Sequence, residues 1–294
     1  MLTTFAVKEE HTMTPTKITD TIELADGNRM PVMGFGTYLI GDQETMTTTI
    51  NAAWNAGYRM FDTAMMYRNE DILGPTIHQL GLPREGLFLT SKVAEVVQGY
   101  DRTMKAVEGS LKRLQTDYLD LLLVHWPVHE YFFDTWRAME QLKADGKVKS
   151  IGVSNYTMAH LELLATQAKE MPVVNQVEYH PYLNQQALLD FDRDQKIVTE
   201  AWSPLGRRVV LDNPMLAKIA KHQGKTVAQV ILRWELQHGL LPIPKSTHVE
   251  RIQENADIFD FSLAEDEMTM IDLLNKNERT GNEPEIVYET GKQY

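Results

Sequence analysis

The chain has 294 residues, of which 43% are hydrophobic and 24% are charged, a composition typical of a soluble globular protein. Its net charge of −12 argues against binding to nucleic acid or to an anionic membrane surface, because both attract basic faces. The absence of cysteine excludes disulfides, cysteine-ligated metals and a cysteine nucleophile, and it is consistent with a cytoplasmic protein. No obligatory protein partner is evident, and we expect none.

The first residues of the chain do not read as a signal peptide, because their apolar stretch is short and acidic residues follow it directly. We expect residues 1–18 to form a mobile tail. A hairpin should follow, since Asp26-Gly27 separates the apolar runs Thr21–Leu24 and Met30–Val32. Residues 19–294 are then expected to form a single domain.

After the hairpin, short β-type runs alternate with amphipathic helical stretches. Several runs are almost continuously apolar, as parallel strands buried on both faces should be. The expected strands are Gly34–Thr37, Tyr58–Thr63, Leu87–Lys92, Leu119–His125, Ser150–Ser154, Val173–Val177, Ile197–Ala201 and Leu241–Pro244. The clearest helical patterns are Thr45–Ala56, Arg102–Leu114, Tyr131–Ala144, Ala159–Ala168 and Val227–His238. Eight such units predict an α/β fold, a (β/α)8 TIM barrel rather than an open doubly wound sheet.

Helix starts can be read at two places late in the chain. Thr226 with Gln229, and Ser262 with Glu265, have the spacing of a capping box, in which two side chains and two backbone N–H groups bond reciprocally. We therefore expect one helix to begin after Thr226 and a later one after Ser262.

In a barrel of this kind, active residues lie at or just after the carboxyl ends of the strands. Asp62, Lys92 and His125 occupy such positions, and Tyr67 follows in the loop after Asp62. A tyrosine hydroxyl is a proton donor, a neighbouring ammonium should lower its pKa, a carboxylate can hold that ammonium, and histidine can donate a hydrogen bond to a substrate oxygen. The set suits protonation of a carbonyl oxygen while a cofactor supplies hydride. Each residue alone is more often a packing residue or half of a salt bridge.

Basic residues after the last expected strand indicate a phosphate site. Lys245 and Ser246 precede a helix that contains Arg251, and a helix start offers free N–H groups to an anion. The alternative is a solvated basic helix start without a ligand.

Other patterns in the sequence fail as motifs. Gly34-x-Gly36 lacks the third glycine of the dinucleotide-binding turn. Asp190–Asp194 imitates the start of a calcium loop, but Gln195 stands where glycine is required, so we expect no metal site. A glycosidase would need two paired carboxylates, and the strand ends offer Asp62 with at most Glu178 or Glu200.

Four segments of the chain resemble the signatures of the aldo-keto reductase superfamily. They are Gly57–Glu70, Leu123–Pro127, Ile151–Asn155 and Ile243–Ser246 with Arg251, Glu254 and Asn255 downstream. The resemblance covers about residues 19 to 280 and implies a barrel whose bottom is closed by the hairpin. It also implies an aldehyde or ketone reductase that binds NADPH across the top of the barrel, with Tyr67 as proton donor, Lys92 tuning it, Asp62 orienting Lys92 and His125 orienting the carbonyl.

The resemblance also assigns residues to the cofactor and to a small-molecule carbonyl substrate. The cofactor residues would be Gly36, Thr37, Ser154, Asn155, Gln176, Trp202, Ser203, Leu205, Lys245, Ser246, Arg251, Glu254 and Asn255. The pocket walls would include Tyr38, Ala94, Trp126, His129, Tyr131 and Phe132, for each of which simple packing is the alternative. Ala94 replaces a tryptophan common in relatives, and the C-terminal loop Arg279–Tyr294 is expected to vary with substrate. A cofactor-binding regulatory subunit on the same barrel is the alternative function.

Overall fold

The computed structural model describes residues 15–292. Most of the predicted tail, residues 1–18, therefore lies outside the described residues. The predicted hairpin is confirmed: β1 (Thr21–Glu23) and β2 (Arg29–Pro31) pair antiparallel. Gly27 adopts a φ of +84° in the turn, a conformation that residues with a Cβ adopt only with strain.

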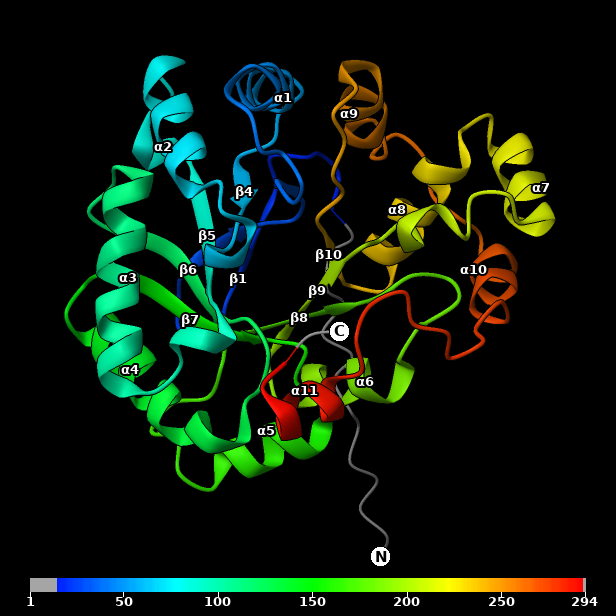
Figure 1. Ribbon diagram of the computed structural model, residues 1–294. Coiled ribbons are helices and arrows are strands. Elements are labelled where there is room, and N and C mark those ends of the chain that lie inside the picture. Colours follow the sequence, from blue (N-terminus) through cyan, green and yellow to red (C-terminus); the bar gives the residue numbers. More distant parts are fainter. Residues whose placement is uncertain (1–14, 293–294) are drawn as a thin grey trace, which may run out of the picture.

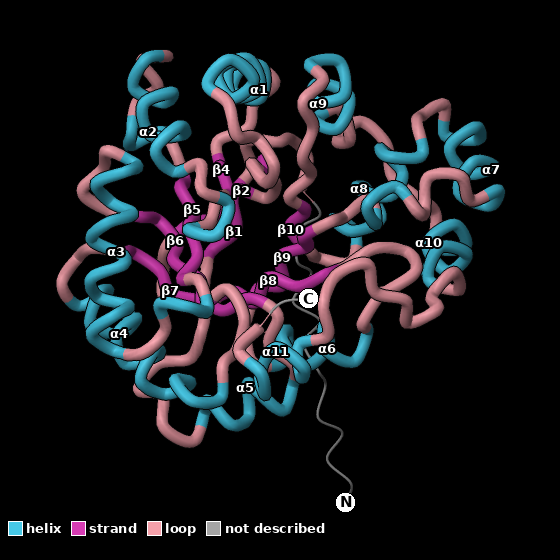
Figure 2. The backbone as a smooth tube through the Cα atoms, viewed as in Figure 1, coloured by secondary structure: helices cyan, strands magenta, loops and turns pink. Residues whose placement is uncertain are grey.

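Eight strands form one parallel sheet in chain order, and the ring that they make is visible in Figure 2. The strands are β3 (Gly34–Gly36), β4 (Met60–Asp62), β5 (Phe88–Val93), β6 (Leu119–Val124), β7 (Val148–Ser154), β8 (Val174–Glu178), β9 (Val198–Trp202) and β10 (Leu241–Pro242). The Gly36 N–H donates to the Pro244 carbonyl at 3.1 Å, which joins the first strand of the ring to the segment after the last. The predicted (β/α)8 barrel is therefore confirmed.

Helices surround this ring, as Figure 1 shows. The helices of the β/α units are α1 (Gln43–Asn55), α2 (Glu70–Gln79), α3 (Tyr100–Leu114), α4 (Phe132–Ala144), α5 (Met158–Ala165), α6 (Gln186–Asp194), α8 (Val227–Gln237) and α9 (Val249–Ala256). Three more helices lie outside this repeat: α7 (Pro214–Gln223), α10 (Glu265–Asp272) and α11 (Pro284–Thr290). None of the helices in the described part of the chain is long and apolar enough to cross a membrane.

The hairpin closes the amino-terminal end of the barrel. The Asn28 amide donates to the Lys149 carbonyl and the Ser150 hydroxyl, near the start of β7. The apolar side chains of the hairpin belong to one buried cluster with the first residues of several barrel strands. This cluster includes Leu24, Met30, Val32, Met60, Phe88, Val174 and Leu241. The hairpin does not cover the opposite end of the barrel, where the carboxyl ends of the strands lie and where a functional site is expected.

The two expected helix starts have different outcomes. The Thr226 hydroxyl accepts from the Gln229 N–H while the Gln229 side chain accepts from the Thr226 N–H, so the first capping box is confirmed. A helix does begin soon after Ser262, at Glu265, but the second capping box is wrong, because the N-cap of α10 is Ala264, whose N–H donates to the Glu267 carboxylate. The Ser262 hydroxyl instead accepts from a buried arginine of α8.

Candidate active site

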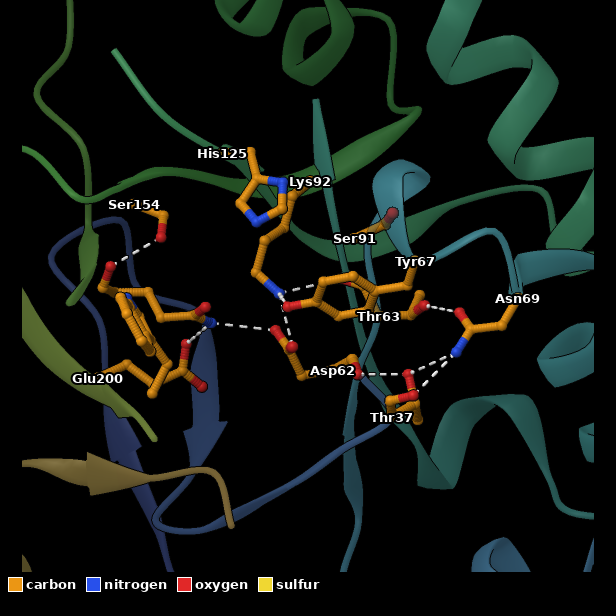
Figure 3. A network of polar contacts seen from close by, with 12 residues as sticks. Thr37, Asp62, Thr63, Tyr67, Asn69, Ser91, Lys92, His125, Ser154 and Glu200 are labelled. Atoms are coloured by element: carbon orange, nitrogen blue, oxygen red, sulfur yellow. Dashed lines mark hydrogen bonds and ion pairs between the residues drawn. The ribbon is translucent and has the colours of Figure 1, made fainter. Parts of the chain in front are cut away.

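Four polar side chains meet at the carboxyl ends of three neighbouring strands (Figure 3). Asp62 ends β4, Lys92 lies near the end of β5, and His125 directly follows β6. Tyr67 ends a short 3-10 helix, Met65–Tyr67, in the loop after β4. The structure thus brings together the four residues that the sequence suggested from strand-end positions alone.

Lys92 is the centre of this group, and its side chain is fully buried. Its Nζ lies 2.5 Å from Asp62 Oδ1, 3.1 Å from the Thr63 carbonyl oxygen and 3.2 Å from the Tyr67 hydroxyl. Three acceptors therefore satisfy the three N–H groups of the ammonium, which is the requirement for keeping a charge out of water. The arrangement fixes the ammonium at hydrogen-bond distance from the tyrosine oxygen.

Burial and charge act against each other on the two titrating groups. Burial raises the pKa of Tyr67, Lys92 lowers it in part, and the net direction is upward. Burial lowers the pKa of Lys92, but Asp62 and Tyr67 raise it by more, so its ammonium form is favoured. The expectation that Lys92 lowers the Tyr67 pKa thus has the right sign for that pair, but desolvation of the phenolate outweighs it.

His125 is a neutral imidazole in this environment. Burial and, after it, the positive charge of Lys92 hold its pKa well below its usual value. Its ring lies edge-on to Tyr67, with centroids 5.9 Å apart. Nδ1 is buried without a partner among the described residues, so the single proton of the neutral ring is better placed on Nε2. A neutral Nε2–H can donate a hydrogen bond to a substrate oxygen.

Two residues fix the loop that carries Tyr67, and sequence reasoning gave neither a role. The Asn69 amide donates to the carbonyls of Thr37 and Ile40 and accepts from the Thr63 hydroxyl. Glu70, which is buried, accepts from Ser91, Ser110 and Arg113 and so ties α2 to β5 and α3. Both residues lie in the signature segment Gly57–Glu70, and this was the available signal.

Residues of β7 to β9 form a second polar group beside the first. The Trp202 Nε1 donates to Asn155 Oδ1 at 2.8 Å, and the Asn155 amide donates to the Ser154 hydroxyl and the His125 carbonyl. Asn155 and Ser203, each directly after a strand, have φ values of +61° and +50°. Left-handed conformations at residues with a side chain cost energy, and they are enriched at functional sites.

A cavity of about 930 Å³ runs from these side chains to α9. Of the predicted cofactor residues, all but Thr37 line it; the hydroxyl of Thr37 is buried and donates to the Asp62 carbonyl. Four basic side chains also line it: Arg207, Arg208, Lys245 and Arg251. Within the described residues no carboxylate forms an ion pair with Lys245 or Arg251. The cavity is therefore lined by both aromatic and polar side chains near the tetrad and by basic side chains at its far end. This arrangement suits an elongated ligand with an anionic group at one end.

The predicted substrate-pocket residues are only partly on this cavity. Tyr38 and Trp126 line it, and Tyr38 packs on Tyr67 with ring centroids 4.9 Å apart. The other four are not among its lining residues. Phe132 stacks on Tyr156 in the core, and His129 packs edge-on against Tyr288 of α11. Tyr131 has the guanidinium of Arg102 over its ring. Ala94 is buried directly after β5. Leu39 and Met66, which sequence reasoning missed, line the cavity instead.

Comparison with known proteins identifies the family. Residues 32–276 match the model of the Aldo/keto reductase family. The chain belongs to this family. A glyoxal reductase of Bacillus subtilis (strain 168) is 51% identical over 271 residues, which are 92% of this chain and 98% of that protein. A methylglyoxal reductase of Escherichia coli O157:H7 is 41% identical, over 90% of this chain and 96% of that protein.

Solved structures agree with this assignment. An aldo/keto reductase from Brucella melitensis is 45% identical and superposes with a TM-score of 0.83 over 87% of this chain and 99% of that one. A Bombyx mori aldo-keto reductase in complex with NADP is 32% identical, with a TM-score of 0.86 over 92% of this chain and 98% of that one. This chain is accordingly an oxidoreductase that reduces carbonyl groups with NADPH.

The residues present fit that cofactor. Trp202 and Asn155 offer an aromatic face and an amide near the tetrad, and the cations Lys245 and Arg251 lie at the far end of the same cavity. The start of α9 follows Ser246, so its free N–H groups face the same region. The anionic end of a phosphorylated dinucleotide would therefore meet cations that no carboxylate in the described chain neutralises.

Proposed function

We propose that this aldo/keto reductase reduces small aldehydes and ketones, with Tyr67 as general acid, and that α-oxoaldehydes such as glyoxal and methylglyoxal are its preferred substrate class. The substrate class rests on the names of the two relatives described above. The role of Tyr67 rests on one observation, its hydroxyl 3.2 Å from the fully buried Lys92 ammonium and beside the His125 ring.

Each member of the tetrad then has one task. Nε2–H of His125 holds the carbonyl oxygen, and Tyr67 gives its hydroxyl proton to that oxygen as the C–O π electrons move onto it. NADPH, when bound, supplies the hydride that the carbonyl carbon receives. Lys92 stabilises the phenolate that remains, Asp62 keeps Lys92 in place, and the phenolate recovers a proton from water.

The cofactor contacts follow the two ends of the cavity. Ser154, Asn155, Gln176 and Trp202 would hold the nicotinamide, and Ser203 and Leu205 begin the loop that would cover the pyrophosphate. The adenosine end would be held by Lys245, Ser246, Arg251, Glu254 and Asn255. Gly36 lines the cavity between them, and Thr37 supports Asp62 rather than the ligand.

We further infer that residues 19–294 act as one domain and that the enzyme works in the cytoplasm without an obligatory partner. The absence of cysteine supports a reducing compartment.

Loss of NADPH absorbance with methylglyoxal, glyoxal, benzaldehyde and a keto sugar tests the proposal. We expect the highest kcat/KM with the α-oxoaldehydes. Tight NADPH binding without turnover of any carbonyl would favour the regulatory alternative and overturn the proposed catalytic roles.

A further inference from the structure

A buried carboxylate that belongs to none of the tetrad's tasks lies behind it. Glu200 is in the middle of β9, its side chain is fully buried, and it is drawn beside Asp62 in Figure 3. Its Oε2 accepts a hydrogen bond of 2.6 Å, whereas its Oε1 has no partner among the described residues. A carboxylate held this far from water without a cation in contact is costly, so its presence calls for a reason.

Gln176 of β8 connects this carboxyl group to the tetrad. Its Nε2 donates to Glu200 Oε2 at 2.6 Å and to Asp62 Oδ2 at 3.0 Å. Both hydrogens of the amide are therefore used on two carboxyl groups, and the orientation of the amide depends on both. Asp62 in turn contacts Lys92 through its other oxygen, so a continuous chain of contacts leads from Glu200 to the ammonium that faces Tyr67.

The charges around Glu200 come from a small set of elements. Asp62 faces it from β4 and Lys92 from β5, with Tyr67 beyond the ammonium. β8, which pairs with β9, carries Glu178 two residues beyond Gln176, and this carboxylate is held by His180 and by the N–H groups of Thr280 and Gly281. β3 and β10 carry no ionisable residue. Asp192 of α6 is buried nearby, but it contacts Thr199, which lies on the opposite face of β9 from Glu200.

We propose that Glu200 is a positioning residue of the catalytic centre, whose ionisation sets the net charge around the buried Asp62–Lys92 pair and thereby the acidity of Tyr67. This rests on the proposed function of the tetrad. Asp62 and Lys92 neutralise each other, so a neutral Glu200 leaves the centre without net charge, whereas an ionised Glu200 adds one negative charge. That charge disfavours the phenolate, and Tyr67 then gives up its proton less readily.

The protonation state of Glu200 changes within an accessible pH range. Burial, with Asp62 adding to it, raises the pKa of Glu200 to about 8. Tyr67 and Lys92 have pKa values raised from values already near or above 10, and the pKa of His125 is lowered well below 6.5. Between pH 7 and 9 these three groups keep their protonation. Burial raises the pKa of Asp192 to about 7, so this second carboxyl group titrates close to the same range. A fall in turnover that disappears when Glu200 alone is replaced is assigned to Glu200, because Asp192 is unchanged in that variant.

The sign of the effect follows from this. Below its pKa, Glu200 is neutral and reduction runs at its full rate. As pH rises through about 8, the group ionises and kcat for reduction is expected to fall about three- to tenfold to a lower plateau, because a buried charge near the site shifts a neighbouring pKa by about half to one unit.

The experiment measures kcat for methylglyoxal reduction at saturating NADPH from pH 6.5 to 9.5. Wild type should show the fall near pH 8, and Glu200→Gln, which keeps an acceptor for Gln176 without an ionisable group, should show no fall across this range. Glu200→Asp retains a carboxyl group and should retain a fall, with a shifted midpoint. The matched control is Glu235→Gln, because Glu235 of α8 is equally buried and both its oxygens lack partners in the described chain.

The possible outcomes test the role of Glu200 separately from the reductase function. A Glu200→Gln enzyme that keeps the wild-type fall, or a Glu235→Gln enzyme that loses it, overturns the role of Glu200 while leaving the reductase function standing. Absence of turnover in wild type at every pH instead overturns the proposed function itself. Where Glu200→Gln folds poorly, the Glu200→Asp midpoint decides: an unshifted midpoint contradicts the proposal.

Discussion

Replacing Tyr67 by phenylalanine is expected to remove catalysis while leaving the fold and cofactor binding in place. The change deletes one oxygen, which is one of three acceptors of the Lys92 ammonium. Asp62 Oδ1 at 2.5 Å and the Thr63 carbonyl at 3.1 Å remain, so the buried charge stays paired. The free energy of unfolding should therefore fall by only about 1 kcal/mol, the usual cost of one hydrogen bond.

The effect on rate should be much larger. Loss of a general acid costs about 10²- to 10⁴-fold, equivalent to about 3–5 kcal/mol in the activation barrier. The assay is NADPH absorbance under saturating substrate, combined with urea unfolding and NADPH titration of the same preparation. A variant that keeps a tenth or more of the wild-type kcat, or one that loses NADPH affinity in parallel, would refute the assignment of Tyr67 as the acid.

Three further changes test other parts of the site. Lys92→Met should abolish turnover and lower the free energy of unfolding by about 3–5 kcal/mol, because it leaves Asp62 buried without its cation. Urea titrations measure this loss. A stability close to that of wild type would contradict the energetic role of the Asp62–Lys92 pair. Arg251→Ala should raise the Kd for NADPH about 10- to 100-fold and leave the Kd for NADH unchanged in fluorescence titrations. Arg137→Ala, which changes an exposed side chain of α4, is the control. Equal losses of affinity for both cofactors would show that Arg251 does not bind the distinguishing phosphate. Gly281→Ala should weaken NADPH binding and change tryptophan fluorescence, because a Cβ at Gly281 would lie 2.4 Å from the Trp202 ring while Glu178 accepts from the N–H groups of Thr280 and Gly281 and holds this backbone in place. The matched control is Gly41→Ala, whose Cβ would have nothing within 4 Å. Identical behaviour of the two variants would exclude the contact between Gly281 and Trp202.

The barrel was predictable because its signals are local. Runs such as Leu121–Val124 are apolar throughout, and parallel strands covered on both faces need that pattern. Helices without such patterning were expected only as parts of the β/α units, and their residues could not be named from the sequence. α2 contains Gly74 and Pro75, and a Cβ at Gly74 would lie 2.5 Å from the backbone of Leu114, so close packing against α3 explains a residue that local propensity disfavours.

The substrate side was less predictable, because which side chain reaches the cavity depends on how each loop returns. Phe132 and His129 were reasonable pocket walls by sequence distance from His125. Both instead pack with Tyr288 of α11, a helix more than 150 residues away in the chain. No pattern in the loop after β6 indicates this contact. The C-terminal helix α11 thus packs on the loop after β6 through residues that do not line the cavity.

The difference between Asp62 and Glu200 shows which functional residues can be identified from the sequence alone and which need the structure. Both are carboxyl groups of barrel strands, and position at a strand end was enough to single out Asp62. Glu200 lies two residues before the end of β9 and had meaning only as a missing glycosidase partner. Its connection to Lys92 depends on Gln176 and Asp62 from two further strands, and its charge state depends on complete burial. A side chain that acts on the acidity of a distant residue through two others can therefore be recognised only once the packing around all of them is known.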